Sequence, residues 1–176
     1  HDGTSVIVDS PASTVTLNGP RTYMVSGTLT VPSGWTFDIN AGVTLMFIAG
    51  SPARLDVVGT LQTAGTSGSR VRFTSGQASP ANGDWVGVYV PGGASATIDL
   101  TYTDILYTEN GIDARSVASL TADLDNVTIS AGSCPLVDNY DQACSGIRVG
   151  GTLSGSMSNT TITASGGSSL AFGIWA

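Results

Sequence analysis

The sequence predicts an all-β protein built as a parallel solenoid of short strands, three in each coil. Three observations support this fold class: the residues of helix surfaces are scarce, apolar residues alternate with a period of two, and one pattern recurs along the chain. The length of 176 residues fits a single domain that covers the whole chain, residues 1–176.

The composition argues against helices. All six basic residues are Arg, Lys is absent, and Glu109 is the single Glu among thirteen acidic residues. Exposed helix positions usually carry Lys, Glu and Gln, whereas this chain uses Thr, Ser, Asn, Asp and 23 Gly. Hydrophobic residues make up 41% of the sequence, which is enough for a packed core.

The net charge and the short apolar runs limit the classes of partner that the protein can have. A net charge of −7 argues against nucleic acid, which needs a basic face. The longest apolar runs, such as residues 43–49, have the length of strands and are far shorter than the roughly 20 residues of a membrane span. The chain begins at His1 with no recognisable signal peptide, which we interpret as a mature or trimmed N-terminus. We expect neither a nucleic-acid partner nor membrane insertion.

Short strands are expected along both halves of the chain. In the N-terminal half, Gly, Pro, Ser and Asn separate alternating segments at 28–31, 36–39, 44–47, 55–58, 60–63 and 71–74. In the C-terminal half, a Gly followed by alternating apolar residues recurs at 87–90, 111–114, 146–149 and 173–176, with spacings of 24, 35 and 27 residues. Between these segments a second block recurs at 100–105, 124–129 and 157–162.

The register of these repeats favours a solenoid over a β-sandwich. In a solenoid, equivalent residues of successive coils stack, whereas a sandwich has no reason to repeat its inward residues at such intervals. The predicted stacks are Leu100, Leu124 and Met157; Ile105, Ile129 and Ile162; and Val88, Ile112, Ile147 and Ile174.

Several segments resemble those of right-handed parallel β-helix proteins, in particular secreted, adhesin-like members: residues 27–36 and 40–45, the step at 59–61, the strand at 71–75 and the segment 84–88. The resemblance covers nearly the whole chain and implies the fold. It does not single out one function, because the architecture also occurs in polysaccharide lyases, glycosidases, phage tailspikes and ice-binding proteins.

The two cysteines bracket an insertion. The coil between Gly111 and Gly146 is 11 residues longer than the preceding one, and the excess falls around residues 133–145. We predict that Cys134 and Cys144 form a disulfide that closes this loop, which implies an oxidising compartment and an extracellular or cell-surface location. The same loop is the best candidate for specific recognition, through Asp138, Tyr140 and Asp141.

Asn126 and Asn159 occupy the same turn position in successive coils, where Tyr102 stands in the coil before. Stacked Asn side chains can hydrogen-bond along a solenoid and so satisfy polar groups at a tight turn. Each Asn also begins an Asn-x-Thr sequence, which is an acceptor for N-glycosylation. A structural ladder and a glycan are both open at these two positions.

Acidic residues give one metal hypothesis. Asp99 and Asp123 each precede the repeated Ile by six residues, and Asp125 is nearby. Two stacked carboxylates repel each other and could share a calcium ion, or they could form a solvated acidic strip. Asp113 and Arg148 share an outward position one coil apart, for which we predict a surface ion pair.

No catalytic site is expected. His1 is the single histidine, which excludes a nucleophilic triad, and the lyases of this fold use clustered Asp with calcium and an Arg or Lys base. We therefore expect a non-enzymatic extracellular protein, either a segment of a surface adhesin or a subunit that associates end to end as a filament. The alternatives are a carbohydrate-active or carbohydrate-binding β-helix, with glycans as partners, and an ice-binding solenoid. For ice binding, the outward column of Thr128 and Thr161 is broken by Asp104, and runs such as 14–16 do not form a regular series.

Overall fold

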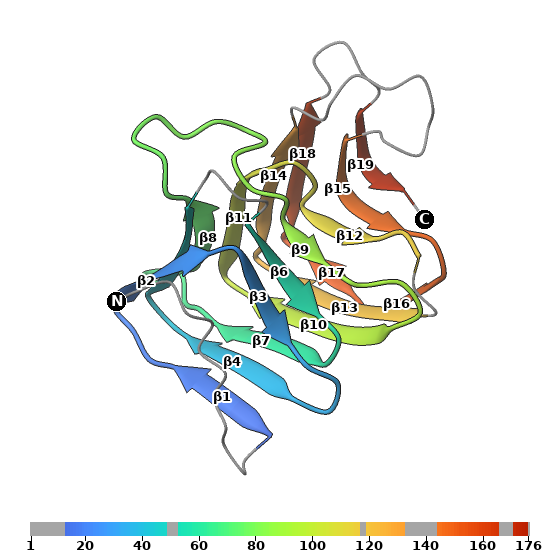
Figure 1. Ribbon diagram of the computed structural model, residues 1–176, viewed down its shortest axis with the longest axis horizontal. Helices are drawn as coiled ribbons and strands as arrows, with labels where there is room; N and C mark the ends of the chain where they lie inside the picture. Colours follow the sequence, from blue (N-terminus) through green and yellow to red (C-terminus); the bar gives the residue numbers. More distant parts are fainter. Residues whose placement is uncertain (1–12, 49–52, 117–118, 133–143, 166–170, 176) are drawn as a thin grey trace.

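The computed structural model describes residues 13–48, 53–116, 119–132, 144–165 and 171–175. In these residues the protein is all-β, and three parallel sheets form the walls of a right-handed β-helix (Figure 1). The predicted fold class is therefore confirmed. The described residues contain no helix that is long and apolar enough to cross a membrane.

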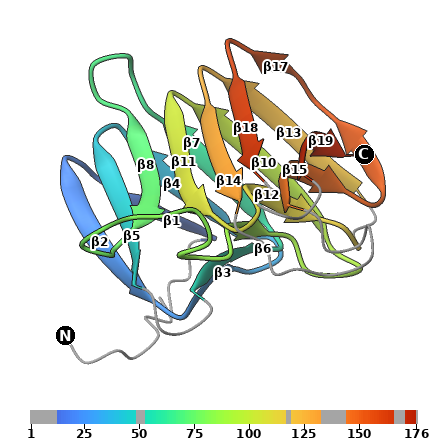
Figure 2. The same cartoon turned by 90° about the horizontal axis from the view of Figure 1, so that it is seen from above.

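Each sheet receives one strand from each coil, except that the last coil gives sheet A two short strands. Strands that are neighbours in space are therefore three elements apart in sequence, or four in most pairs that involve the last coil. Sheet A contains β1 (Thr14–Leu17), β4 (Thr36–Asn40), β7 (Thr60–Ala64), β10 (Ser95–Thr101), β13 (Ser119–Asp125), β16 (Thr152–Ser154) and β17 (Met157–Ser158). Sheet B contains β2 (Arg21–Ser26), β5 (Val43–Ile48), β8 (Val71–Ser75), β11 (Thr103–Thr108), β14 (Thr128–Gly132) and β18 (Thr161–Ser165). Sheet C contains β3 (Thr28–Val31), β6 (Arg54–Val57), β9 (Val88–Tyr89), β12 (Ile112–Ala114), β15 (Cys144–Val149) and β19 (Ala171–Trp175). Figure 2 shows the strands of successive coils side by side, from blue to red.

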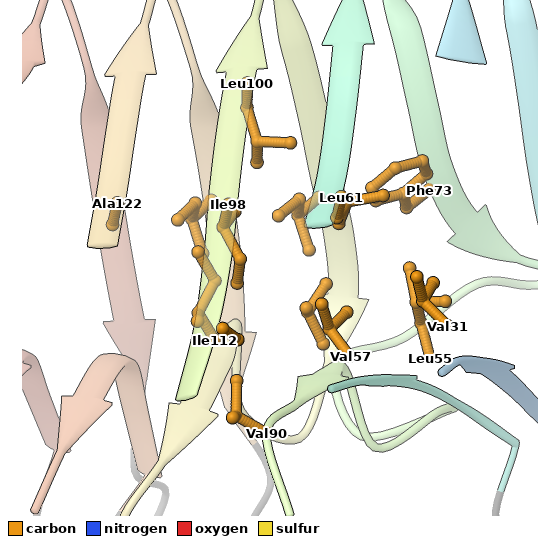
Figure 3. Packing of buried hydrophobic residues seen from close by; sticks show 14 of the residues in the cluster. Val31, Leu55, Val57, Leu61, Phe73, Val90, Ile98, Leu100, Ile112 and Ala122 are labelled. Atoms are coloured by element: carbon orange, nitrogen blue, oxygen red, sulfur yellow. The ribbon is translucent and has the colours of Figure 1, made fainter. Parts of the chain in front are cut away.

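Apolar side chains of all three sheets fill the interior (Figure 3). The predicted stacks are register partners: Leu100 pairs with Leu124, Ile129 with Ile162, and Ile112 with Ile147. Like residues lie on like residues because every coil presents its alternate positions to the same interior. The inward residues Leu61, Ile98, Phe73 and Leu55 are completely buried.

The corner between sheets A and B divides each of the blocks that recur in the sequence. Tyr102, Asn126 and Asn159 have φ values of 43°, 55° and 47°, so the chain turns at each of them in the left-handed region. Each recurring block is therefore the end of a strand in sheet A followed by the start of a strand in sheet B. Asn tolerates this conformation better than most residues, which explains its recurrence at the corner.

A second long coil was not predicted. The coil from Thr60 to its register partner Thr97 is longer than the coil from Ser95 to its register partner Ser119. The extra residues form a loop after β8. Within this loop, the ring of Trp85 stacks on the ring of Phe47, with 3.9 Å between the ring centroids. The Nε1 atom of Trp85 donates to the Leu106 carbonyl at 2.8 Å. The loop projects from the coil at residues 77–81, which are exposed, and its end inserts the Trp85 side chain into the interior (Figure 1).

The predicted insertion around 133–145 lies mostly outside the described residues. Cys134 and the recognition candidates Asp138, Tyr140 and Asp141 fall in that part of the chain. Cys144 begins β15, where it is buried, and no described cysteine is a free thiol. The disulfide between Cys134 and Cys144 stays a prediction.

Candidate functional site

A column of polar side chains runs across four strands of sheet C. Asp56, Tyr89, Asp113 and Arg148 are successive register partners on β6, β9, β12 and β15. We call these four residues the sheet C column. Because the strands are parallel and in register, residues from four successive coils meet along one line of the wall.

The predicted surface ion pair of Asp113 and Arg148 is wrong in one respect. Their register is as expected, but Asp113 is 2% exposed and Arg148 is 3% exposed, so neither lies on an open surface. The alternation of a strand indicates the side to which a residue points, but it does not indicate what covers that side. Charged groups this deeply buried need partners of opposite charge or hydrogen-bond donors and acceptors.

Two ion pairs flank the column. The Nε atom of Arg54 lies 2.7 Å from Oδ1 of Asp56, and a second guanidinium nitrogen donates to Oδ2 at 3.1 Å. The guanidinium carbon of Arg54 also lies 4.9 Å from the centre of the Tyr89 ring, within the range of a cation–π contact. Further along, Nε of Arg115 donates to both carboxylate oxygens of Asp113, at 3.0 and 2.9 Å.

Glu109 adds a second carboxyl group beside Asp113. Burial raises the pKa of Glu109 above its ordinary value of 4.5, the Arg115 guanidinium opposes this shift, and the Asp113 carboxylate adds to it. The backbone nitrogen of Glu109 donates to the Trp85 carbonyl at 2.8 Å, which ties this residue to the long loop. Two carboxyl groups in unlike surroundings are the arrangement from which general acid and base pairs are made.

Comparison with protein families agrees with this architecture. Residues 9–119 match the model described as a pectate-lyase-like β-helix domain, which is more than half of the 176-residue chain. The chain belongs to the pectate-lyase-like β-helix family. No curated protein and no solved structure matches it.

The candidate metal residues lie on sheet A, on a different wall from the column. Asp99 and Asp123 are register partners, and burial followed by the Asp123 carboxylate raises the pKa of Asp99. Asp123 accepts hydrogen bonds from the backbone nitrogen and hydroxyl of Ser156, at 2.9 and 2.7 Å. The described residues contain no group of three or more His, Cys, Asp or Glu side chains that could hold a metal ion. Calcium at this place stays a prediction.

Asp125 lies at the corner between sheets A and B, at the end of β13. Its carboxylate accepts hydrogen bonds from the Ser158 hydroxyl and from the Asn126 amide, the latter at 3.0 Å. These two bonds lower the pKa of Asp125, and a further side-chain hydrogen bond from Asn159 acts in the same direction. The structure thus places both candidate glycosylation residues, Asn126 and Asn159, beside one carboxylate. The glycan and the structural ladder remain predictions.

Sequence reasoning missed Arg54, Tyr89 and Glu109 as parts of a site, and it assigned Arg115 no partner. A signal for the column was present: Tyr89, Asp113 and Arg148 each follow a glycine of the repeated pattern by two residues. No repeat marks Arg54, because its register partner in the preceding coil is Thr28, a residue of another type, and Glu109 lies outside the repeated segments.

Proposed function

We propose that this protein is a non-enzymatic, extracellular β-helix with a structural or adhesive role, either as a segment of a surface adhesin or as a subunit of an end-to-end filament. One observation supports the proposal most directly. The interior columns reach the last described coil without being covered: Ile174 is the register partner of the completely buried Ile147, yet it is 46% exposed. Met157, which pairs with the buried Leu124, is 42% exposed.

A further coil stacked on β16 to β19 would bury these side chains and pair the strand edges there. Unpaired edges of parallel sheets are templates for further strands, and neighbouring coils stabilise each other in solenoids. The coil can come from a continuing chain, as in an adhesin, or from a second copy, as in a filament. The predicted disulfide between Cys134 and Cys144 supports a location outside the cytoplasm.

Electron microscopy of negatively stained protein over a concentration series tests the filament form. We expect rods that lengthen with concentration, and we expect Ile174→Arg to stop this growth because a buried charge has no partner at the junction. Thr163→Arg is the matched control, since Thr163 lies exposed on the outer face of β18. Rods of one length at every concentration, in the wild type and both variants, would refute the filament and leave the adhesin segment.

A second candidate function, a carbohydrate-active or carbohydrate-binding domain, is favoured by the carboxyl groups of Glu109 and Asp113 beside Arg115. Guanidinium groups bind sugar carboxylates, and a carboxyl group with a raised pKa can donate a proton. The family match supports this candidate without indicating a substrate.

Polyuronates and neutral polysaccharides are the substrates to test, by release of reducing ends and by calorimetry. If this candidate is right, Glu109→Gln abolishes cleavage while Asp38→Asn, on sheet A, leaves it unchanged. Cleavage that Glu109→Gln does not alter would exclude this site, and absence of both cleavage and binding would exclude this function for the polysaccharides tested.

A further inference from the structure

Three Asn-Gly pairs lie between strands of the described chain, and the fold protects them to different degrees. They are Asn18-Gly19, Asn82-Gly83 and Asn110-Gly111. Asn is a thermolabile residue, and it reacts most readily before Gly, because a residue without Cβ lets its backbone nitrogen approach the Asn side chain. The exposure of each Asn and the hydrogen bonds of each following nitrogen therefore decide which pair can react.

The pair Asn82-Gly83, in the loop after β8, is held at both residues. The Gly83 nitrogen donates to the Thr108 carbonyl at 3.1 Å. The Asn82 side chain donates to the Ala131 carbonyl at 3.3 Å and accepts from the Ser130 hydroxyl at 3.2 Å. A nitrogen that donates a hydrogen bond must break it before it can act as a nucleophile, so this pair is protected.

The pair Asn110-Gly111 is protected by burial as well as by hydrogen bonds. Asn110 is 3% exposed, and its Oδ1 accepts from the Ser145 nitrogen at 3.1 Å. The Gly111 nitrogen donates to the Ser145 carbonyl at 3.0 Å. Both residues of this pair are therefore fixed against the neighbouring strand β15.

The pair Asn18-Gly19, at the corner between β1 and β2, has neither protection. Both residues are exposed, and the Gly19 nitrogen donates to no other residue in the described part of the chain. The Nδ2 atom of Asn40 donates to Oδ1 of Asn18 at 2.7 Å. A donor at this oxygen stabilises the negative charge that develops on it when a nucleophile attacks the side-chain carbonyl carbon. An unbonded nitrogen therefore follows a polarised carbonyl group.

The corner requires glycine at position 19. A Cβ atom there would lie 2.2 Å from the Ala41 carbonyl oxygen and 2.9 Å from the Val43 nitrogen, and both of these are backbone atoms. Because two successive coils approach each other this closely, the fold itself keeps the residue that makes Asn18 reactive.

We propose that Asn18 is a site of spontaneous backbone modification. The Gly19 nitrogen gives up its proton and forms a bond to Cγ of Asn18, while the side-chain amide nitrogen takes up a proton and leaves as ammonia. Water then opens the cyclic imide at either of its two carbonyl groups. Opening at the Asn18 backbone carbonyl gives isoaspartate, in which the chain continues through the former side chain, and opening at Cγ gives aspartate.

Isoaspartate puts one extra carbon atom into the backbone between β1 and β2, which residues 18–20 connect. β1 is in register with β4 and β2 with β5, so one of these pairings must absorb the extra length. β1 is the shorter strand, with four residues against six in β2, and it lies at the edge of sheet A. Its release leaves the edge of β4 unpaired, and an unpaired edge can pair with another strand. This slow switch lies at the opposite end of the β-helix from β19, so it does not depend on the function proposed above.

Peptide mass spectrometry of the full chain, kept in mildly alkaline buffer with and without guanidinium chloride, tests the chemistry. In the folded chain we expect Asn18 to lose ammonia at least about tenfold faster than Asn82 and Asn110, since each of these must first break a hydrogen bond of the attacking nitrogen. In the unfolded chain the three should react at similar rates, because all three glycine nitrogens are then free. Equal rates in the folded chain, or the same preference for Asn18 in the denaturant, would overturn the proposal.

Hydrogen exchange of β1 tests the structural consequence. We expect faster exchange of the β1 amides in aged wild-type protein than in fresh protein. Freshly prepared Asn18→Asp is the matched control, since it carries the charge of the product without the extra backbone carbon, and its β1 should exchange as slowly as in the fresh wild type. Aged Asn18→Ser, which forms no imide, should also keep the slow exchange. An equal increase in aged Asn18→Ser, or no increase in the aged wild type, would overturn the release of β1.

Discussion

Asp125 stabilises the corner between sheets A and B through hydrogen bonds from Ser158, Asn126 and Asn159. Because Asn126 and Asn159 both have positive φ, the strained turn of each coil is tied to the same carboxylate. One side chain thus connects two successive turns, and its ionisation state affects both.

This arrangement predicts a pH dependence. The pKa of Asp125 is lower in the folded protein than its ordinary value of 3.8, so the folded state binds the proton less tightly than the unfolded state. The stabilisation is complete above the ordinary value and is lost as the pH falls through the folded value. We expect Asp125→Asn to lower the Tm at neutral pH, and we expect the difference from the wild type to disappear in acid. Thermal unfolding followed by circular dichroism checks this, and a difference that is the same at all pH values would contradict it.

At the scale of the element, the loop after β8 depends on Trp85. Its side chain is 2% exposed, stacks on Phe47 and donates to the Leu106 carbonyl. Trp85→Ala should reduce the free energy of unfolding by about 3–5 kcal/mol, because it leaves a cavity and an unpaired carbonyl. Trp85→Phe keeps an aromatic ring against Phe47 and should cost less. Urea unfolding followed by circular dichroism measures both, and equal small losses would show that the loop does not depend on this packing.

The elements show what the sequence could predict and what it could not. The stacks of Leu100 on Leu124 and of Ile129 on Ile162 follow from alternation and repeat spacing alone. The loop carrying Trp85 was missed because no repeat marks an insertion between coils of different composition. The burial of Asp113 was missed for another reason: a strand pattern gives the direction of a side chain, whereas its cover comes from other parts of the fold.

Repeat spacing predicted the candidate site residues to the same extent. Asp99 and Asp123 were predicted to stack, and they do, because their coils have equal spacing. The alignment of Thr14, Thr36, Thr60, Thr97 and Thr121 along sheet A was not predicted, since Thr60 and Thr97 belong to coils separated by the long loop. Groups of side chains that are brought together by coils of unequal length can be identified only when the strand register is known.

At the scale of the whole molecule, stability should vary along the β-helix axis. Strands β10 and β13 each alternate between buried and half-buried residues, whereas β16, β17 and β18 contain no buried residue. A solenoid coil is stabilised by its two neighbours, so coils that have a neighbour on only one side open at lower free energy.

Hydrogen exchange measured by mass spectrometry should therefore show slow exchange for the amides of β10 and β13 and fast exchange for those of β18. If coils associate through the surface that contains Ile174, exchange in β18 should slow as the protein concentration rises, while exchange in β10 should not change. Ile174→Arg should remove this concentration dependence and leave the slow amides of β10 as they are, because Ile174 does not contact that coil directly. Uniform protection from β10 to β18 at every concentration would contradict the expectation, since the domain would then open as one cooperative unit. The experiment thus separates a gradient of stability within one chain from stabilisation by a second copy.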